Sequence, residues 1–222
     1  MRAVTDRDRA GFSAFVEVGP AAPAILDVAK RFGADIVVIG RKATHDAQRI
    51  GSVALRVVRD SPVPVLVARD PVGNGPVVAA VDLGKGSTEV VRVAAEIARR
   101  RNTSLDVVHA IDFGRSEVLL ALSAFFGGSM PPAADETGIV ALALAALESE
   151  LAANGAKGAA SVVKGDPKHE VLARAATLGA SLLVVGATAH PLLTRLGLGS
   201  VADAAVRGAA TSVLVVRRSS EV

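Results

Sequence analysis

The chain has 222 residues, enough for one large domain or one and a half typical ones, and half of them are hydrophobic, which predicts a substantial core rather than disorder. The net charge is only +3, the lysines and arginines are scattered, and six phenylalanines are the only aromatic residues, so a base-stacking nucleic-acid surface is not expected. The absence of cysteine excludes disulfides, thiolate metal sites and cysteine nucleophiles.

An internal repeat indicates that the chain holds two copies of one domain. Residues 15–43 align without gaps with residues 161–189, and after a short gap residues 51–69 match residues 199–217. The period of about 147 residues is too long for a solenoid repeat. We therefore expect a first copy over residues 1–70, which retains only the back half of the domain, and a complete second copy over residues 76–222.

The first copy begins with a charged stretch, MRAVTDRDRAGF, that is typical of the end of a helix rather than the start of a domain. This character favours a natural protein that begins well before residue 1. Three apolar runs predict strands at residues 13–18, 35–40 and 64–69. The glycine and proline residues of 71–75 then predict a linker.

The second copy alternates strands with helices, which predicts an α/β fold with an open, parallel, five-stranded sheet and helices on both faces. Ser87 is the expected N-cap of the first helix and Asp166 that of the third, which Gly179 ends. Strands are predicted at residues 77–82, 104–111, 159–164, 181–186 and 212–217, and helices at residues 87–101, 137–153, 167–178 and 199–209.

A glycine-dotted loop follows the fourth predicted strand of the second copy. It reads Gly186-x-x-Ala189, nine residues, then Gly199-Ser200. Gly199, Ser200 and Val201 would begin a helix whose first N–H groups have no intrahelical partner, and the helix dipole would favour an anion there. The same residues are equally typical of a serine-capped turn that binds water.

This loop, together with Asp82 after the first strand and the ending SVLVV, resembles the universal stress protein family in its tandem-domain form. Nucleotide-binding members carry G-x-x-G, nine residues, then G-[S/T], from which this chain departs only at Ala189. The resemblance covers Gly75 to Arg217 as a whole domain and Phe15 to Arg69 as the back half of another. It implies a Rossmann-like sheet with strand order 3-2-1-4-5.

The resemblance also implies a role for individual residues. Asp82 would lie against an adenine, although an aspartate after a strand is also typical of a helix-initiating turn. Ala110 would take the second adenine-side position, where valine is commoner. Gly186, Ala189, Gly199, Ser200 and Val201 would form the phosphate loop, in which the methyl group of Ala189 would crowd the phosphates if that position needs a positive φ.

No catalytic or metal-binding motif accompanies this loop. The segment GKGST at residues 84–88 resembles a P-loop, but Ala79 stands where its first glycine is required. The four histidines show no metal-ligand spacing, and no Ser/His/Asp group is evident. We therefore expect slow ATP hydrolysis at most.

These observations lead to one main hypothesis and two alternatives. The first is a cytoplasmic, stress-response regulatory protein that binds an adenine nucleotide, ATP with or without Mg²⁺, in its second copy. The second is a nucleotide-free interaction module whose two copies act as a pseudo-dimeric scaffold. The third is another nucleotide-using α/β enzyme, such as an electron-transfer flavoprotein or an adenylating relative. No apolar run approaches the roughly 18 residues of a membrane span, and no signal-peptide pattern opens the chain.

The implied strand order has a consequence for the first copy. Its two central strands are missing, so residues 35–40 would present an unpaired apolar edge unless residues 13–18 close up against them. The missing first strand and a shorter loop after Gly40 argue against a nucleotide site in this copy. The last strands, at residues 64–69 and 212–217, are expected to pair between the copies or to bind a protein partner or a second chain.

Overall fold

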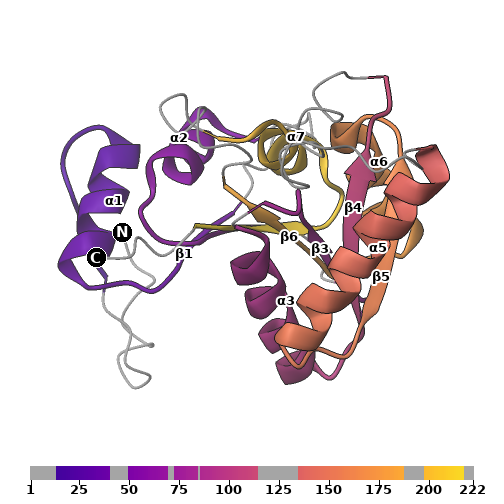
Figure 1. The fold of residues 1–222 in the computed structure, drawn as a ribbon. Helices are drawn as coiled ribbons and strands as arrows, with labels where there is room; N and C mark the ends of the chain where they lie inside the picture. The colour runs from indigo at the N-terminus through magenta and orange to yellow at the C-terminus, as the bar shows by residue number, and fades with distance from the viewer. Residues whose placement is uncertain are drawn as a thin grey trace.

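A computed structural model describes residues 14–40, 50–69, 73–84, 86–114, 135–187 and 198–217. Its centre is one seven-stranded sheet in the order β1-β2-β7-β6-β3-β4-β5 (Figure 1). The strands are β1 (Val37–Gly40), β2 (Val65–Ala68), β3 (Val77–Ala80), β4 (Leu105–Ile111), β5 (Ala159–Lys164), β6 (Leu182–Gly186) and β7 (Ser212–Val216). The helices are α1 (Ala21–Arg31), α2 (Ser52–Asp60), α3 (Ser87–Arg101), α5 (Glu136–Ala153), α6 (Pro167–Thr177) and α7 (Ser200–Gly208).

The strands of the second copy confirm the expected order 3-2-1-4-5. They run β5-β4-β3-β6-β7, and every neighbouring pair among them is parallel. Chain order reverses between β3 and β6, where Val77 lies opposite Leu182. This reversal is the place where ligands of open α/β sheets usually bind.

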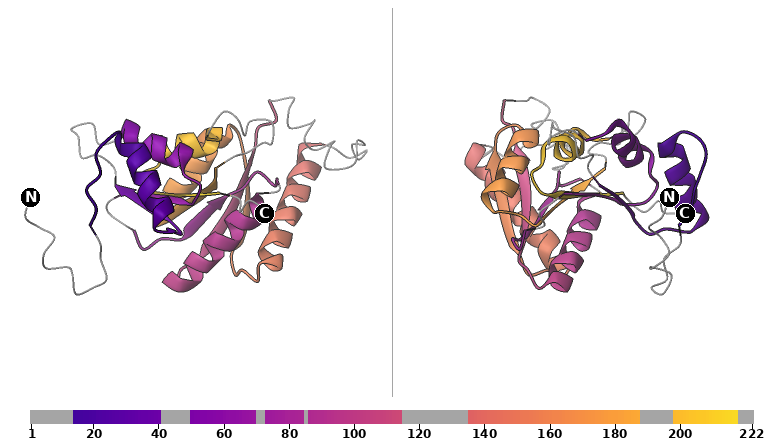
Figure 2. Two further views of the ribbon diagram at one scale, coloured as in Figure 1. Left: turned by 90° about the vertical axis from the view of Figure 1, so that its left-hand side faces the viewer. Right: turned by 180° about the vertical axis from the view of Figure 1, so that it is seen from behind.

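Helices cover both faces of this sheet, as the alternation of elements predicts. The helices α3 and α5 bury Val91 and Leu147 against one face, and α6 and α7 bury Val171 and Val206 against the other. Figure 2 shows the same layering from two further sides. The side chains of β3 are buried on both faces, which accounts for its continuous apolar sequence.

The third expected helix of the second copy begins and ends as predicted, but the first does not. The Asp166 side chain accepts the Lys168 N–H at 3.1 Å, and Gly179 has a φ of +56° after α6. In α3 the N-cap is Gly86, and Ser87 is the first helical residue. The prediction of Ser87 as N-cap is wrong because its hydroxyl donates to Asp82 rather than accepting a helix N–H.

The first copy contributes β1, β2, α1 and α2 to one end of the molecule (Figure 1). The strand expected at residues 13–18 is wrong: residues 14–18 form no strand, and Val16 and Val18 are 77% and 100% exposed. In the second copy the matching strand β5 pairs with β4. No described residue of the first copy takes the place that β4 has beside β5. An extended segment without a neighbouring strand has no backbone partners for the hydrogen bonds of a sheet. Among the described strands, β1 therefore pairs only with β2.

The two copies are joined through their last strands, as expected. The strands β2 and β7 pair antiparallel, with Leu66 opposite Leu214. Two matching arginines add reciprocal contacts across this pair: Arg69 Nη2 donates to the Val206 carbonyl at 2.6 Å, and Arg217 Nη2 donates to the Val58 carbonyl at 2.7 Å. Since the repeat aligns Arg69 with Arg217 and Val58 with Val206, the two halves are related by an approximate twofold arrangement.

No helix in the described part of the chain combines the length and apolar character needed to cross a membrane.

Candidate functional site

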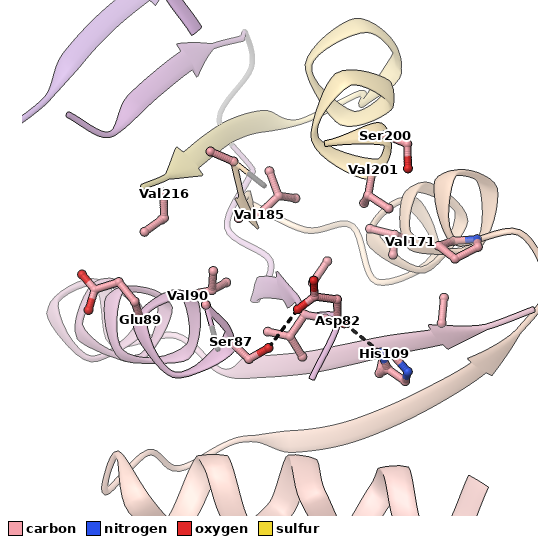
Figure 3. Close-up of a pocket in the computed structure, with 17 residues that line it drawn as sticks. Asp82, Ser87, Glu89, Val90, His109, Val171, Val185, Ser200, Val201 and Val216 are labelled. Atoms are coloured by element: carbon pink, nitrogen blue, oxygen red, sulfur yellow. Dashed lines mark hydrogen bonds between the residues drawn. The ribbon is translucent and has the colours of Figure 1, made fainter. Parts of the chain in front are cut away.

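A cavity of about 200 Å³ opens at the carboxyl ends of β3, β4 and β6, where the chain order of the sheet reverses (Figure 3). The first turns of α3 and α7, together with α6, complete its walls. Ligand pockets are commonly about 300–1,000 Å³, so the space enclosed by the described walls is smaller than a typical ligand pocket. The lining residues are Ala80, Val81, Asp82, Gly86, Ser87, Glu89, Val90, His109, Ala110, Pro167, Val171, Val185, Gly186, Ala187, Ser200, Val201 and Val216.

Most residues that the sequence singled out meet at this cavity. Asp82, Ala110, Gly186, Ser200 and Val201 all line it, although they come from three separate elements (β4, β6 and α7) and the segment after β3. Two positions differ. Gly199 is the N-cap of α7 but is not a lining residue, and Ala189 lies outside the described residues.

Asp82 uses its two carboxylate oxygens differently. Its Oδ1 accepts the Gly84 N–H at 2.9 Å and the Ser87 hydroxyl at 3.3 Å, which closes the turn between β3 and α3. Leu83, inside this turn, has a φ of +58°. The other oxygen points away from Ser87 and toward the cavity (Figure 3). Asp82 is thus a turn residue through one oxygen and a possible hydrogen-bond acceptor for a ligand through the other.

The start of α7 forms the opposite wall. The N–H of Gly199 donates to the Ala187 carbonyl at 2.7 Å, so it is already used inside the protein. The next three N–H groups, from Ser200 to Ala202, have no intrahelical partner by the geometry of an α-helix. No side chain caps this helix, and Ser200 is exposed. The first turn of α7 therefore offers N–H groups, a hydroxyl and a partial positive charge to an anion.

Glu89 adds a second carboxylate to the wall formed by α3. Arg92 donates to both of its oxygens, at 2.8 and 2.9 Å. These hydrogen bonds hold the pKa of Glu89 below its usual value. The cavity thus has two acidic side chains near α3 and the positive end of a helix dipole at α7, an arrangement that suits a ligand with N–H donors at one end and an anion at the other.

Sequence reasoning missed His109 as a member of the site. It precedes Ala110 on β4, and its Nδ1 lies 2.8 Å from the Val81 carbonyl, to which it donates. Burial lowers the pKa of His109, and the contacts with Val81 and Asp82 oppose this effect only in part. The ring is therefore neutral near pH 7, with the proton on Nδ1. Its place at the carboxyl end of a strand, beside Ala110, was the only available signal.

The neutral His109 predicts a pH dependence of stability. Its pKa is lower in the folded protein than in the unfolded chain, so the unfolded state binds more protons as the pH falls below about 6.5. We expect the melting temperature to decline between about pH 6.5 and 5, and His109→Gln to reduce that decline. Thermal unfolding followed by circular dichroism at several pH values measures this decline in melting temperature for the wild type and the variant. The exposed His169 provides the control, and an equal effect of His169→Gln would contradict the assignment.

The first copy repeats only part of this arrangement. Gly40 ends β1 and Gly51 is the N-cap of α2, in the places of Gly186 and Gly199. The loop between them, residues 41–49, lies outside the described residues. Within the described part of the chain, β1 has no neighbour in the position that β3 takes beside β6, so no counterpart of Asp82 faces α2.

Comparison with known proteins gives a consistent result. The model of the universal stress protein family matches residues 2–69 and 73–217. A protein of unknown function from Pseudomonas aeruginosa PAO1 is 16% identical with a TM-score of 0.69, and the match covers 96% of this chain and 74% of that one. A universal stress protein from Archaeoglobus fulgidus DSM 4304 is 20% identical with a TM-score of 0.63, covering 89% and 67%. These two matches show the fold.

A universal stress protein solved in complex with cAMP is 28% identical with a TM-score of 0.46, and the match covers 65% of this chain and 98% of that one. Among curated proteins, none matches the chain significantly.

Proposed function

Because the chain belongs to the universal stress protein family, we propose that its second copy is a nucleotide-binding regulatory domain that binds ATP in the cavity beside β3 and β6. The observation that carries the proposal is the placement of Asp82 and the start of α7 on opposite walls of one cavity at the reversal of strand order. An adenine amino group is a donor that the second oxygen of Asp82 can accept, and a phosphate is an anion that the N–H groups of α7 can bind.

The size and lining of the cavity support separate positions for the base and for the phosphates of the nucleotide. Apolar side chains from β6, α6 and α7 (Val185, Val171 and Val201) face the space beside Asp82 (Figure 3). They suit the flat, largely apolar face of a base. The phosphates would extend past Ser200, which is exposed at the start of α7. Ala110 would contact the base with a smaller side chain than the valine that is commoner in the family.

We further propose that Mg²⁺ enters with the triphosphate. In nucleotide-binding proteins this ion usually takes substrate phosphate oxygens as ligands, with few protein carboxylates. Within the described ranges, no group of three or more His, Asp or Glu side chains is placed to hold a metal ion. The phosphates are accordingly the proposed source of its ligands.

A second candidate function is the nucleotide-free scaffold. It is favoured by the reciprocal contacts of Arg69 and Arg217, which join the two copies as a pseudo-dimer. In this case the protein acts through its surface, and the cavity contributes nothing to its role.

Titration of ATP into the full chain separates these two functions. We expect ATP to bind with a Kd in the micromolar range, about −8 kcal/mol at 1 μM, and GTP to bind more weakly because its carbonyl oxygen would meet the acceptor oxygen of Asp82. Isothermal titration calorimetry measures both nucleotides. If millimolar ATP produces neither heat nor a shift in melting temperature, the scaffold is the better description.

A further inference from the structure

We propose that Arg69, which belongs to the first copy, is a positioning residue for the nucleotide site of the second copy. The inference rests on the proposed function, because it assigns to the first copy a part in the affinity of that site. It gives the first copy, in whose described residues no counterpart of Asp82 faces α2, a role in ligand binding.

Arg69 acts at the far end of the helix whose start lines the cavity. Its Nη2 donates to the Val206 carbonyl at 2.6 Å, and the guanidinium is buried, with only 5% of the residue exposed. Val206 lies in the last turn of α7, where carbonyl groups have no intrahelical donor. A cation at this end also interacts favourably with the helix dipole. Arg69 thus fixes one end of a nine-residue helix whose other end presents Ser200 and Val201 to the ligand.

Arg69 is itself held in place from the second copy. Its backbone N–H donates to Ser212 Oγ at 3.0 Å, and the same hydroxyl lies 3.3 Å from the Arg69 carbonyl. Ser212 begins β7, and β7 ends at Val216, another lining residue of the cavity. The contacts of Arg69 therefore connect two elements of the cavity wall, α7 and β7.

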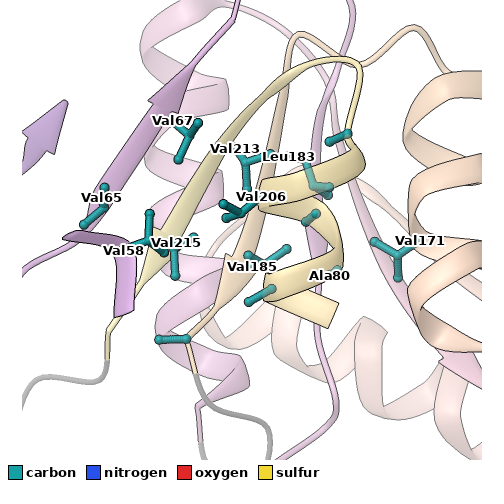
Figure 4. Packing of buried hydrophobic residues seen from close by; sticks show 14 of the residues in the cluster. Val58, Val65, Val67, Ala80, Val171, Leu183, Val185, Val206, Val213 and Val215 are labelled. Atoms are coloured by element: carbon teal, nitrogen blue, oxygen red, sulfur yellow. The ribbon is translucent and has the colours of Figure 1, made fainter. Parts of the chain in front are cut away.

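The packing around α7 continues without interruption from the first copy to the cavity. Val65 and Val67 of β2 are buried in the same cluster as Val206, and this cluster also contains the lining residues Val185 and Val171 (Figure 4). Close-packed interiors transmit a displacement of one element to its neighbours. A change at the end of α7 is therefore expected to move its first turn relative to the walls formed by Val185 and Val171.

The approximate twofold arrangement supplies a matched control. Arg217 makes the corresponding bond to the Val58 carbonyl in the last turn of α2, and it also donates to the neighbouring Arg59 carbonyl, but no residue of α2 lines the cavity. Both arginines cross the same β2–β7 junction. Arg217→Met therefore removes an equivalent bond between the copies without releasing α7.

The test measures ATP affinity by calorimetry for the full-length wild type, Arg69→Met and Arg217→Met. We expect Arg69→Met to raise the Kd by at least about fivefold and Arg217→Met to leave it within about twofold, a difference in the range of typical coupling between sites. Melting temperatures show whether the two variants lose similar stability. Equal effects on affinity, or none from Arg69→Met, would overturn the inference. If Arg69→Met does not fold, Arg69→Gln, too short to make the same bond, takes its place with the same expectation.

Hydrogen exchange separates this inference from the proposed function. If the wild type does not bind ATP, the proposed function fails, and exchange of the amides of residues 200–206 still reports on α7. Faster exchange there in Arg69→Met than in Arg217→Met supports the positioning role. Equal exchange in the two variants excludes it.

Discussion

Asp82→Ala is expected to weaken ATP binding by about 1.5–3 kcal/mol, roughly a tenfold to hundredfold increase in Kd. The substitution removes the acceptor oxygen that faces the cavity. It also removes Oδ1, which holds the Gly84 N–H and the Ser87 hydroxyl in the turn before α3. Asp82→Asn separates these effects, because an amide oxygen can still accept from Gly84 while its nitrogen would face the ligand as a donor. We expect both variants to bind ATP weakly, as measured by calorimetry.

Asp112 provides the matched control for this experiment. It follows β4 as Asp82 follows β3, and its Oδ1 accepts the Gly114 N–H at 3.0 Å in a similar turn. It is not a lining residue of the cavity. Asp112→Ala therefore removes a comparable turn contact at the same edge of the sheet. Similar losses of affinity in Asp82→Ala and Asp112→Ala would mean that general disturbance of this edge, rather than a ligand contact, weakens binding.

Arg174→Leu is expected to destabilise the protein by about 3 kcal/mol, because it leaves a buried carboxylate without its cation. Arg174 on α6 donates to Asp106 on β4 at 2.7 and 3.2 Å, and Ser161 on β5 donates to the same carboxylate at 2.9 Å. Asp106 is only 5% exposed. The hydrogen bond to Asp106 raises the pKa of Arg174, which keeps the guanidinium charged. Thermal unfolding should show a decrease of about 6–12 °C for a chain of this size.

The exposed pair of Arg207 and Asp203 tests whether burial causes this cost. Its atoms approach to 2.8 Å, close to the distance in the buried pair, but both side chains are more than one third exposed. We expect Arg207→Leu to change stability by less than about 0.5 kcal/mol. A large loss from Arg207→Leu, or a small one from Arg174→Leu, would contradict the role assigned to burial.

The sequence by itself determined the elements of the second copy and the membership of most of the cavity wall. Apolar runs and helical periodicity depend on local residues, so they predicted β3 to β7 and their helices within a few residues. Asp166 and Gly179 act on their own helix, and both behave as expected. Parallel strands bring their carboxyl ends to one edge of the sheet, so the sequence alone predicts that Asp82, Gly186 and Ser200 lie together.

Only the tertiary structure decided how particular polar groups and edges are used. Ser87 donates to Asp82, the turn residue that precedes its helix, instead of capping that helix, and the Gly199 N–H donates to the Ala187 carbonyl on the far side of the loop instead of remaining free, because these partners compete for the two groups. Residues 14–18 form no strand, although their sequence favours one, because a strand needs a neighbour and the described first copy offers none. The burial of His109 and the reciprocal bonds of Arg69 and Arg217 likewise follow from the packing of segments far apart in the chain, which no local pattern records.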